Sequence, residues 1–250
     1  MNEDFYIGYL PKMSKSLAKV VKTFVVLALT AAIGLAVVSW VGQKPFAKSF
    51  FEFGTVKDFE GTIQAQSVPF LLVEKAEKIN GLPAFERLPL VAEGKHGFAA
   101  KDFDGQRVKL KGTLIYRDDL RMIEVAGGTV ERLPENLKPI EEAPENLGNF
   151  TLRGEIVDSK CYLGVMNPGS SKPHRDCAVA CLRGGIPPLF IVKDNSGRIS
   201  ELWLVSENGE SINTEILDFV AEPVEIPGAV SRLGDQLFFK INPPQIKRLP

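Results

Sequence analysis

The sequence predicts a mostly β protein in which one N-terminal transmembrane helix is followed by two small β-barrel domains. An uncharged apolar run from Thr23 to Val41 predicts the helix. The alternation of apolar and polar residues in RVKLKGTLI, residues 107 to 115, is typical of a half-buried strand. A pattern that recurs at a constant offset of 116 residues indicates that the two β domains are an internal duplication.

Composition limits the classes of function. The chain has 250 residues, a formal net charge of −1, and three cysteines. A charge this close to zero gives no general electrostatic basis for binding nucleic acid. Three cysteines are too few for a disulfide scaffold and odd in number, so one thiol stays unpaired unless all three share a ligand.

The N-terminal region predicts a single-pass membrane protein. Residues 1–19 form a polar tail and residues 20–41 the transmembrane helix, with Trp40 at an interfacial position. No clear A-x-A cleavage site follows, which favours an uncleaved anchor over a signal peptide. Lysines are more frequent before the span than after it, so we expect a cytoplasmic N-terminus, an inner-membrane anchor, and exported or periplasmic C-terminal domains. The lysines counted before the span are Lys12, Lys15, Lys19 and Lys22, and those counted after it are Lys44 and Lys48.

Glycine and proline divide the exported part. We expect a juxtamembrane connector over 42–57, a first β domain over 58–133, and a second over 150–250. The intervening segment 134–149, PENLKPIEEAPENLGN, is rich in proline and glutamate, and we predict that it is a linker.

The proposed repeat has an insertion in its second copy. The offset of 116 aligns Val108 with Val224 and Gly112 with Gly228, whereas FEGTI (59–63) aligns with LRGEI (152–156) at an offset of 93. The second copy therefore carries about 23 additional residues after its first strand (116 minus 93). The insertion contains the segment 161–188, which holds all three cysteines.

The order of predicted elements resembles that of OB-fold barrels. In the second domain we expect strands near 151–158, 189–193 and 200–205, a short helix near 213–220, and strands near 223–230 and 236–241. OB-like barrels bind ligands with the loops that join strands 1–2 and 4–5. The resemblance implies that the segment 161–188 occupies a ligand-binding loop.

Within that segment the sequence predicts a set of metal ligands. A short helix is expected to begin after Ser170 or Ser171 and to end at Gly184. His174, Cys177 and Cys181 then share one helix face, and Cys161 meets them from the preceding strand. Three thiolates and an imidazole suit copper, zinc or an iron–sulfur centre. Met166 adds a soft thioether, whereas His96 is predicted to be a surface histidine.

The spacing of Cys177 and Cys181, with His174, resembles the copper-binding set of the Sco-type copper chaperones, which are also membrane-anchored. The resemblance covers only these residues, because the thioredoxin-like fold of that family differs from the β pattern of this chain. Because an anchored topology is combined with soft ligands grouped in one loop, we expect a non-catalytic subunit or assembly factor of a membrane redox system, with partners in a membrane complex and a metal or redox site on Cys161, His174, Cys177 and Cys181.

Two alternatives remain open at this stage. The cysteines could form a disulfide in a structural or interaction protein of the cell envelope, since export favours oxidation. Alternatively, the chain could be a thiol enzyme in which His174 activates a cysteine. We regard an enzyme as the less favoured class.

Overall fold

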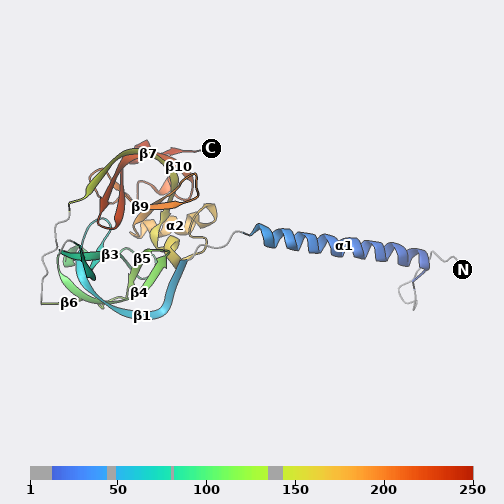
Figure 1. Cartoon of the computed structure of the whole chain (residues 1–250), viewed down its shortest axis with the longest axis horizontal. Coiled ribbons are helices and arrows are strands. Elements are labelled where there is room, and N and C mark those ends of the chain that lie inside the picture. The colour runs from blue at the N-terminus through green and yellow to red at the C-terminus, as the bar shows by residue number, and fades with distance from the viewer. Residues whose placement is uncertain (1–12, 44–48, 80–81, 135–142, 250) are drawn as a thin grey trace. The chain divides into compact units, whose positions relative to one another are not determined.

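A computed structural model of the chain describes residues 13–43, 49–79, 82–134 and 143–249; the side chains of 76–79, 82 and 83 are not described. The chain divides into two compact units, residues 1–46 and 47–250. The first contains the helix α1 (Lys15–Gly42), and the second contains all the strands (Figure 1).

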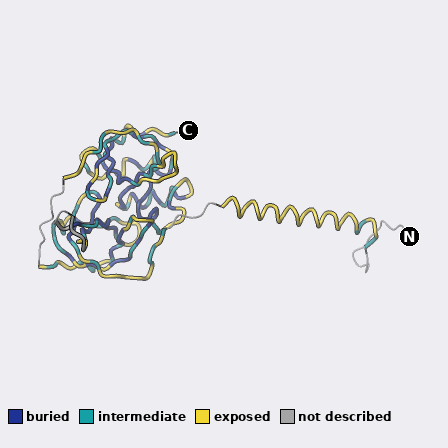
Figure 2. Tube along the Cα trace, in the orientation of Figure 1, coloured by how far each residue is buried: buried dark blue, intermediate teal, exposed yellow. Residues whose placement is uncertain are grey.

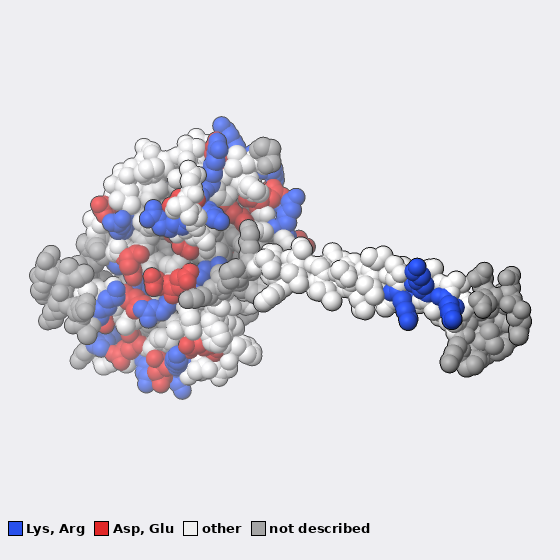
Figure 3. All heavy atoms as spheres, turned by 45° about the vertical axis from the view of Figure 1, so that its right-hand side comes forward, with Lys and Arg blue, Asp and Glu red and all other residues white. Residues whose placement is uncertain are grey.

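Helix α1 is apolar on every side from Thr23 onward. None of its residues is buried, and Figure 2 shows it exposed along its length. The hydroxyl groups of Thr23 and Thr30 donate hydrogen bonds to carbonyl oxygens one turn earlier, so they need no outside partner. In Figure 3 the lysines of α1 gather toward its N-terminal end. The helix is long and apolar enough to cross a membrane, a property of both membrane anchors and signal sequences.

The second unit consists of two closed five-stranded β-barrels, which confirms the predicted fold class. Barrel one contains β1 (Ser49–Gln64), β2 (Phe70–Ile79), β3 (Leu82–Ala92), β4 (Arg107–Arg117) and β5 (Leu120–Val125), with the short β6 (Glu131–Arg132). Barrel two contains β7 (Glu145–Asp158), β8 (Pro188–Lys193), β9 (Ile199–Ser206), β10 (Pro223–Leu233) and β11 (Gln236–Ile241), with the short β12 (Lys247–Arg248).

Both barrels have the same strand order. Barrel one pairs β1-β2-β3-β5-β4 and closes through β4 and β1. Barrel two pairs β7-β8-β9-β11-β10 and closes through β10 and β7. The third and fifth strands run parallel in each, and the other pairs are antiparallel. This is the five-stranded arrangement expected for OB-like barrels.

The strand registers reproduce both sequence offsets. Gly112 pairs with Val125 across β4 and β5, and Gly228 pairs with Ile241 across β10 and β11. Gly61 pairs with Val108, and Gly154 pairs with Val224. The residues aligned at 116 and at 93 in the sequence are therefore equivalent in the barrels, as a duplicated module requires.

Side-chain contacts repeat as well. Arg132 stacks its guanidinium on the ring of Phe103 at 4.9 Å, and Arg248 stacks on Phe219 at the same distance. Each arginine also donates to the backbone oxygen of the residue that precedes its phenylalanine. Both phenylalanines end three-residue 3-10 turns, η1 (Lys101–Phe103) and η4 (Leu217–Phe219). These paired contacts tie the end of each copy to the turn before its fourth strand.

The observed elements differ from the expected ones at the start of two strands and in the extent of one helix. Strand β1 begins at Ser49, inside the expected connector 42–57, because Ser49–Phe51 pair with β4 before a bulge. Strand β7 begins at Glu145, inside the expected linker 134–149, through pairing with Arg232 of β10. Residues 135–142 of that linker lie outside the described residues.

The helix predicted over 213–220 is wrong in extent, since only the turn η4 forms there. The side-chain amide of Asn213 donates to the backbone oxygens of Leu182 and Ile186. These tertiary hydrogen bonds hold the segment against the preceding insertion, so its conformation is set by that contact rather than by helical periodicity.

A shared apolar cluster joins the two barrels. It combines Phe70, Ile115 and Met122 of barrel one with Trp203 and Phe238 of barrel two. Phe70 makes edge-to-face contacts with both of those aromatic rings. The cluster also includes Cys161 and Cys181, so the cysteine-bearing segment is part of the core between the barrels.

Candidate metal centre

The cysteines lie in the loop that joins the first and second strands of barrel two, as the offsets predicted. This loop contains η2 (Cys161–Val165), η3 (Lys172–His174) and α2 (Arg175–Arg183) before β8 begins at Pro188. The corresponding connection in barrel one runs only from Gln64 to Phe70. η2 packs against β1, β4 and β5, so the insertion fills the space beside barrel one.

The three cysteine thiols converge on one point. The sulfur of Cys161 lies 4.0 Å from the sulfur of Cys177 and 4.0 Å from that of Cys181. All three sulfurs lie within 4.8 Å of one another, and none is in a disulfide. Cys161 begins η2 directly after β7, and the other two are one turn apart on α2.

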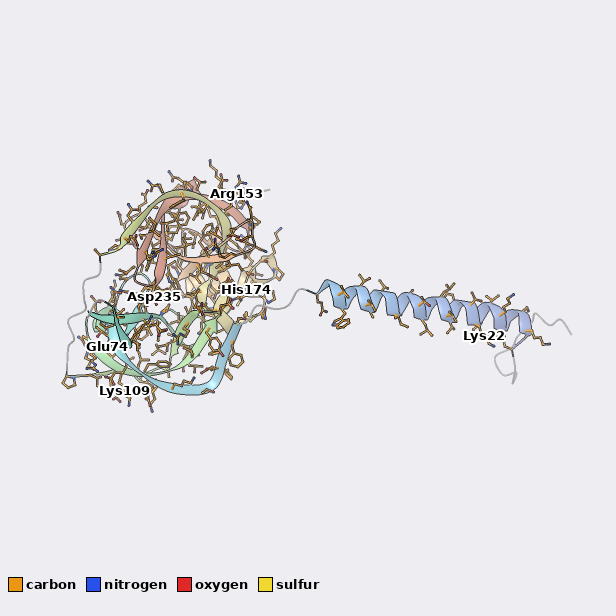
Figure 4. All side chains as sticks on the ribbon, in the orientation of Figure 1. Lys22, Glu74, Lys109, Arg153, His174 and Asp235 are labelled. Atoms are coloured by element: carbon orange, nitrogen blue, oxygen red, sulfur yellow. The ribbon has the colours of Figure 1, made fainter. Side chains whose placement is uncertain are left out.

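Asp158 and His174 form a second, fully buried pair beside the thiols. One carboxylate oxygen of Asp158 is 2.8 Å from Nε2 of His174, and the other accepts a 2.8 Å hydrogen bond from the backbone N–H of Cys161. The exposed fractions are 0% for Asp158 and 3% for His174. Asp158 therefore connects the end of β7 with the starts of both η2 and α2. Figure 4 shows His174 inside the barrel unit.

The four predicted ligands are thus divided between two overlapping groups. Cys161, Cys177 and Cys181 make up the first, and Asp158, Cys161 and His174 the second. Cys161 is common to both, so His174 lies close to the thiols but faces a carboxylate. The donor types in each group are ones that transition metals use.

Barrel one contributes a cation to the site. Nζ of Lys95 donates to the sulfur of Cys177 at 3.5 Å. This hydrogen bond and the negative charge of the sulfur raise the pKa of Lys95. Because Lys95 lies in the connection after β3, the site is shared between the barrels.

The thiols differ in their electrostatic environment. The hydrogen bond between Cys161 and Cys181 raises the pKa of Cys161, and burial raises it further. The same hydrogen bond lowers the pKa of Cys181. A bound cation would replace the proton of that hydrogen bond, because thiolates are the metal-binding form.

Residues 92–97, which we call the docking loop, hold the barrels together at the site. The N–H of Gly97 donates to the oxygen of Gly184 at 2.9 Å. The buried ammonium of Lys160 donates to the oxygens of Ala92 and Gly94 at 2.9 and 2.6 Å and pairs with Glu124. The loop is therefore fixed on both sides of Lys95.

Replacing Gly184 by alanine is expected to loosen this docking. The new Cβ would lie 1.7 Å from the backbone oxygen of Lys95, so the loop must move. We expect a loss of about 1–3 kcal/mol in the free energy of unfolding, measured by urea denaturation. Gly127→Ala is the matched control, since its nearest neighbouring atom would be 3.6 Å away. Equal stability of the two variants would contradict the docking role.

Other residues singled out in the sequence lie outside the thiol cluster. His96 is exposed, which confirms the surface assignment. Met166 is 44% exposed. Lys95, Asp158 and Lys160 were missed. Asp158 and Lys160 lie three residues and one residue before Cys161, so their position in the sequence could have indicated that they belong to the site. Nothing in the sequence places Lys95 near Cys177.

Comparison with known proteins adds no assignment: no protein-family model matches the sequence, and a search of the curated proteins finds no match.

Proposed function

We propose that this chain is a membrane-anchored, non-catalytic subunit or assembly factor of a membrane redox system, and that it holds one thiophilic metal ion on Cys161, Cys177 and Cys181. The observation that carries the proposal is the convergence of the three sulfurs. The anchor is α1, with the N-terminus in the cytoplasm and the barrels on the outer face of the inner membrane.

The sulfur spacing fits a single ion. Two edges of the sulfur triangle are 4.0 Å and the third is at most 4.8 Å. For a third edge between those two lengths, the centre of the triangle lies about 2.3–2.5 Å from each sulfur, which is close to the usual zinc–thiolate distance of about 2.3 Å. In an iron–sulfur cluster at most two cysteine thiolates bind one iron, so three sulfurs that converge on one point disfavour that cofactor. Cu(I) and zinc remain the candidates, and both accept soft thiolate ligands.

The surroundings favour Cu(I) over zinc. Structural zinc sites take four ligands, whereas the group that converges here supplies three. Because Nε2 of His174 is in contact with Asp158, His174 could supply a fourth ligand only through Nδ1. In its observed position, His174 fixes the carboxylate that orients Cys161. A three-thiolate site in a dry apolar setting suits a soft monovalent ion.

A role in a membrane redox system follows from these properties together. Two of the three thiols are buried, so the site is suited to retaining its ion. An anchored, exported domain that holds copper is suited to delivering it to, or keeping it in, a respiratory-type membrane complex. Isolation of the chain with its native membrane partners should therefore recover a metal-containing oxidoreductase.

The test is elemental analysis with a free-thiol count on the same sample of full-length chain, purified in detergent without reductant. We expect about one equivalent of copper or zinc, and its loss in Cys177→Ser. Met166→Leu serves as the control, because this soft but exposed side chain should not affect metal content. One disulfide, one free thiol and no metal would contradict the proposal and favour an envelope protein with a stapled loop.

A further inference from the structure

We infer that the metal ion enters and leaves this site through Cys177, by exchange with the thiolate of an incoming partner that Lys95 attracts. The inference rests on the proposed function and adds a route and a partner chemistry to it. Its basis is the unequal exposure of the three thiols and the position of the ammonium beside the most exposed one.

The three thiols have one open side. Cys161 and Cys181 are 3% and 1% exposed, whereas Cys177 is partly exposed. Behind the buried pair lies the apolar cluster shared by the barrels, to which Tyr162 and Leu163 belong. A ligand from solvent can therefore approach the ion only beside Cys177, so Cys161 and Cys181 act as the retaining pair.

Lys95 gives this opening a positive charge. Its side chain is exposed, and its ammonium lies 3.5 Å from the sulfur of Cys177. An exposed cation at the rim raises the local concentration of anionic ligands and speeds their approach, most strongly at low ionic strength. The incoming group that suits both the soft ion and this charge is a thiolate.

The opening is held in place by both barrels. Lys160 fixes the docking loop before Lys95 through the oxygens of Ala92 and Gly94, and the Gly97–Gly184 hydrogen bond fixes it afterwards. Lys95 therefore remains beside Cys177 without being part of α2. A position fixed across two barrels suits a residue that guides a ligand and does not itself bind the ion.

The exchange step conserves charge and oxidation state. The sulfur of the partner thiol forms a bond to the metal as the bond between the metal and Cys177 breaks. The incoming group has given its proton to solvent before it binds as a thiolate, and Cys177 leaves as a thiolate that takes up a proton from solvent, so no net charge is gained or lost. No electron is transferred, so the step requires no oxidant or reductant.

The experiment uses the full-length protein in detergent, loaded with Cu(I) under anaerobic conditions. Copper release to an anionic thiol, mercaptosuccinate, is compared with release to an uncharged thiol, 2-mercaptoethanol, at low ionic strength. Protein-bound copper is measured by elemental analysis after rapid gel filtration. In Lys95→Glu we expect the ratio of the two rates, anionic over neutral, to fall about tenfold. Lys101→Glu, a charge reversal at another exposed lysine of barrel one, should leave the ratio unchanged.

A second measurement tests the route without Lys95. In the metal-free protein, iodoacetamide should modify Cys177 at least tenfold faster than Cys161 or Cys181, as mapped by mass spectrometry. Equal modification of all three thiols, or an unchanged rate ratio in Lys95→Glu, would overturn the exchange route while leaving the metal site intact. A wild-type protein that takes up no copper would overturn the proposed function together with the route.

Discussion

Replacing Glu124 by glutamine is expected to destabilise the barrel unit by about 3–5 kcal/mol, the cost of leaving a buried charge without its partner. Side chains of Lys160 and Glu124 are 3% and 15% exposed. In the variant the ammonium of Lys160 keeps only neutral acceptors, the two backbone oxygens and the new amide oxygen, and none of them offsets its charge. We expect the docking loop, which contains the oxygens of Ala92 and Gly94, to separate from barrel two.

Urea denaturation of the variants measures this effect. Lys160→Met combined with Glu124→Leu should be far closer to the wild type than Glu124→Gln alone, because the double variant removes both charges. Glu225→Gln is the surface control, since its partner Arg153 has a side chain that is 72% exposed. It should cost less than about 1 kcal/mol. If Glu124→Gln costs no more than Glu225→Gln, the pair does not hold the barrels together.

The internal repeat was predictable from the sequence to the level of strand register. The two offsets give the observed partners, such as Gly112 with Val125 and Gly228 with Ile241, because glycine and apolar positions are fixed by barrel closure. The difference between the offsets also located the insertion. The ends of the strands could not be predicted. The first three residues of β1 pair with β4 beyond a bulge, and the local pattern of apolar residues does not indicate such pairing.

The site was predictable in its ligand types and only partly in its geometry. Helical spacing placed Cys177 and Cys181 on one face of α2, and the insertion brought Cys161 to them. The same spacing placed His174 near the thiols, which the structure bears out, but no local pattern indicates that its Nε2 contacts the buried carboxylate of Asp158. Lys95 is on the other barrel, so its contact depends on how two domains pack, which no local pattern encodes.

Replacing Asp158 by alanine is expected to lower metal affinity by about 10–100-fold, the usual effect of removing a group that orients a metal ligand. Both carboxylate oxygens are engaged, one by the N–H of Cys161 and one by Nε2 of His174. Without them, the start of η2 and the start of α2 lose their common support. The three sulfurs would then no longer be held at a spacing that fits one ion.

Competition with a chromophoric Cu(I) chelator measures the affinity, and urea denaturation of the metal-free protein measures the accompanying loss of stability. Asp158→Asn should retain more affinity than Asp158→Ala, because its amide oxygen still accepts from Cys161. Asp194→Ala, which removes a carboxylate that bonds only within its own exposed turn, is the matched control and should leave affinity unchanged. His174→Ala added to Asp158→Ala should cost little more, since the two residues act through one hydrogen bond. Additive losses would instead indicate that His174 binds the metal directly, and would return it to the ligand set that the sequence predicts.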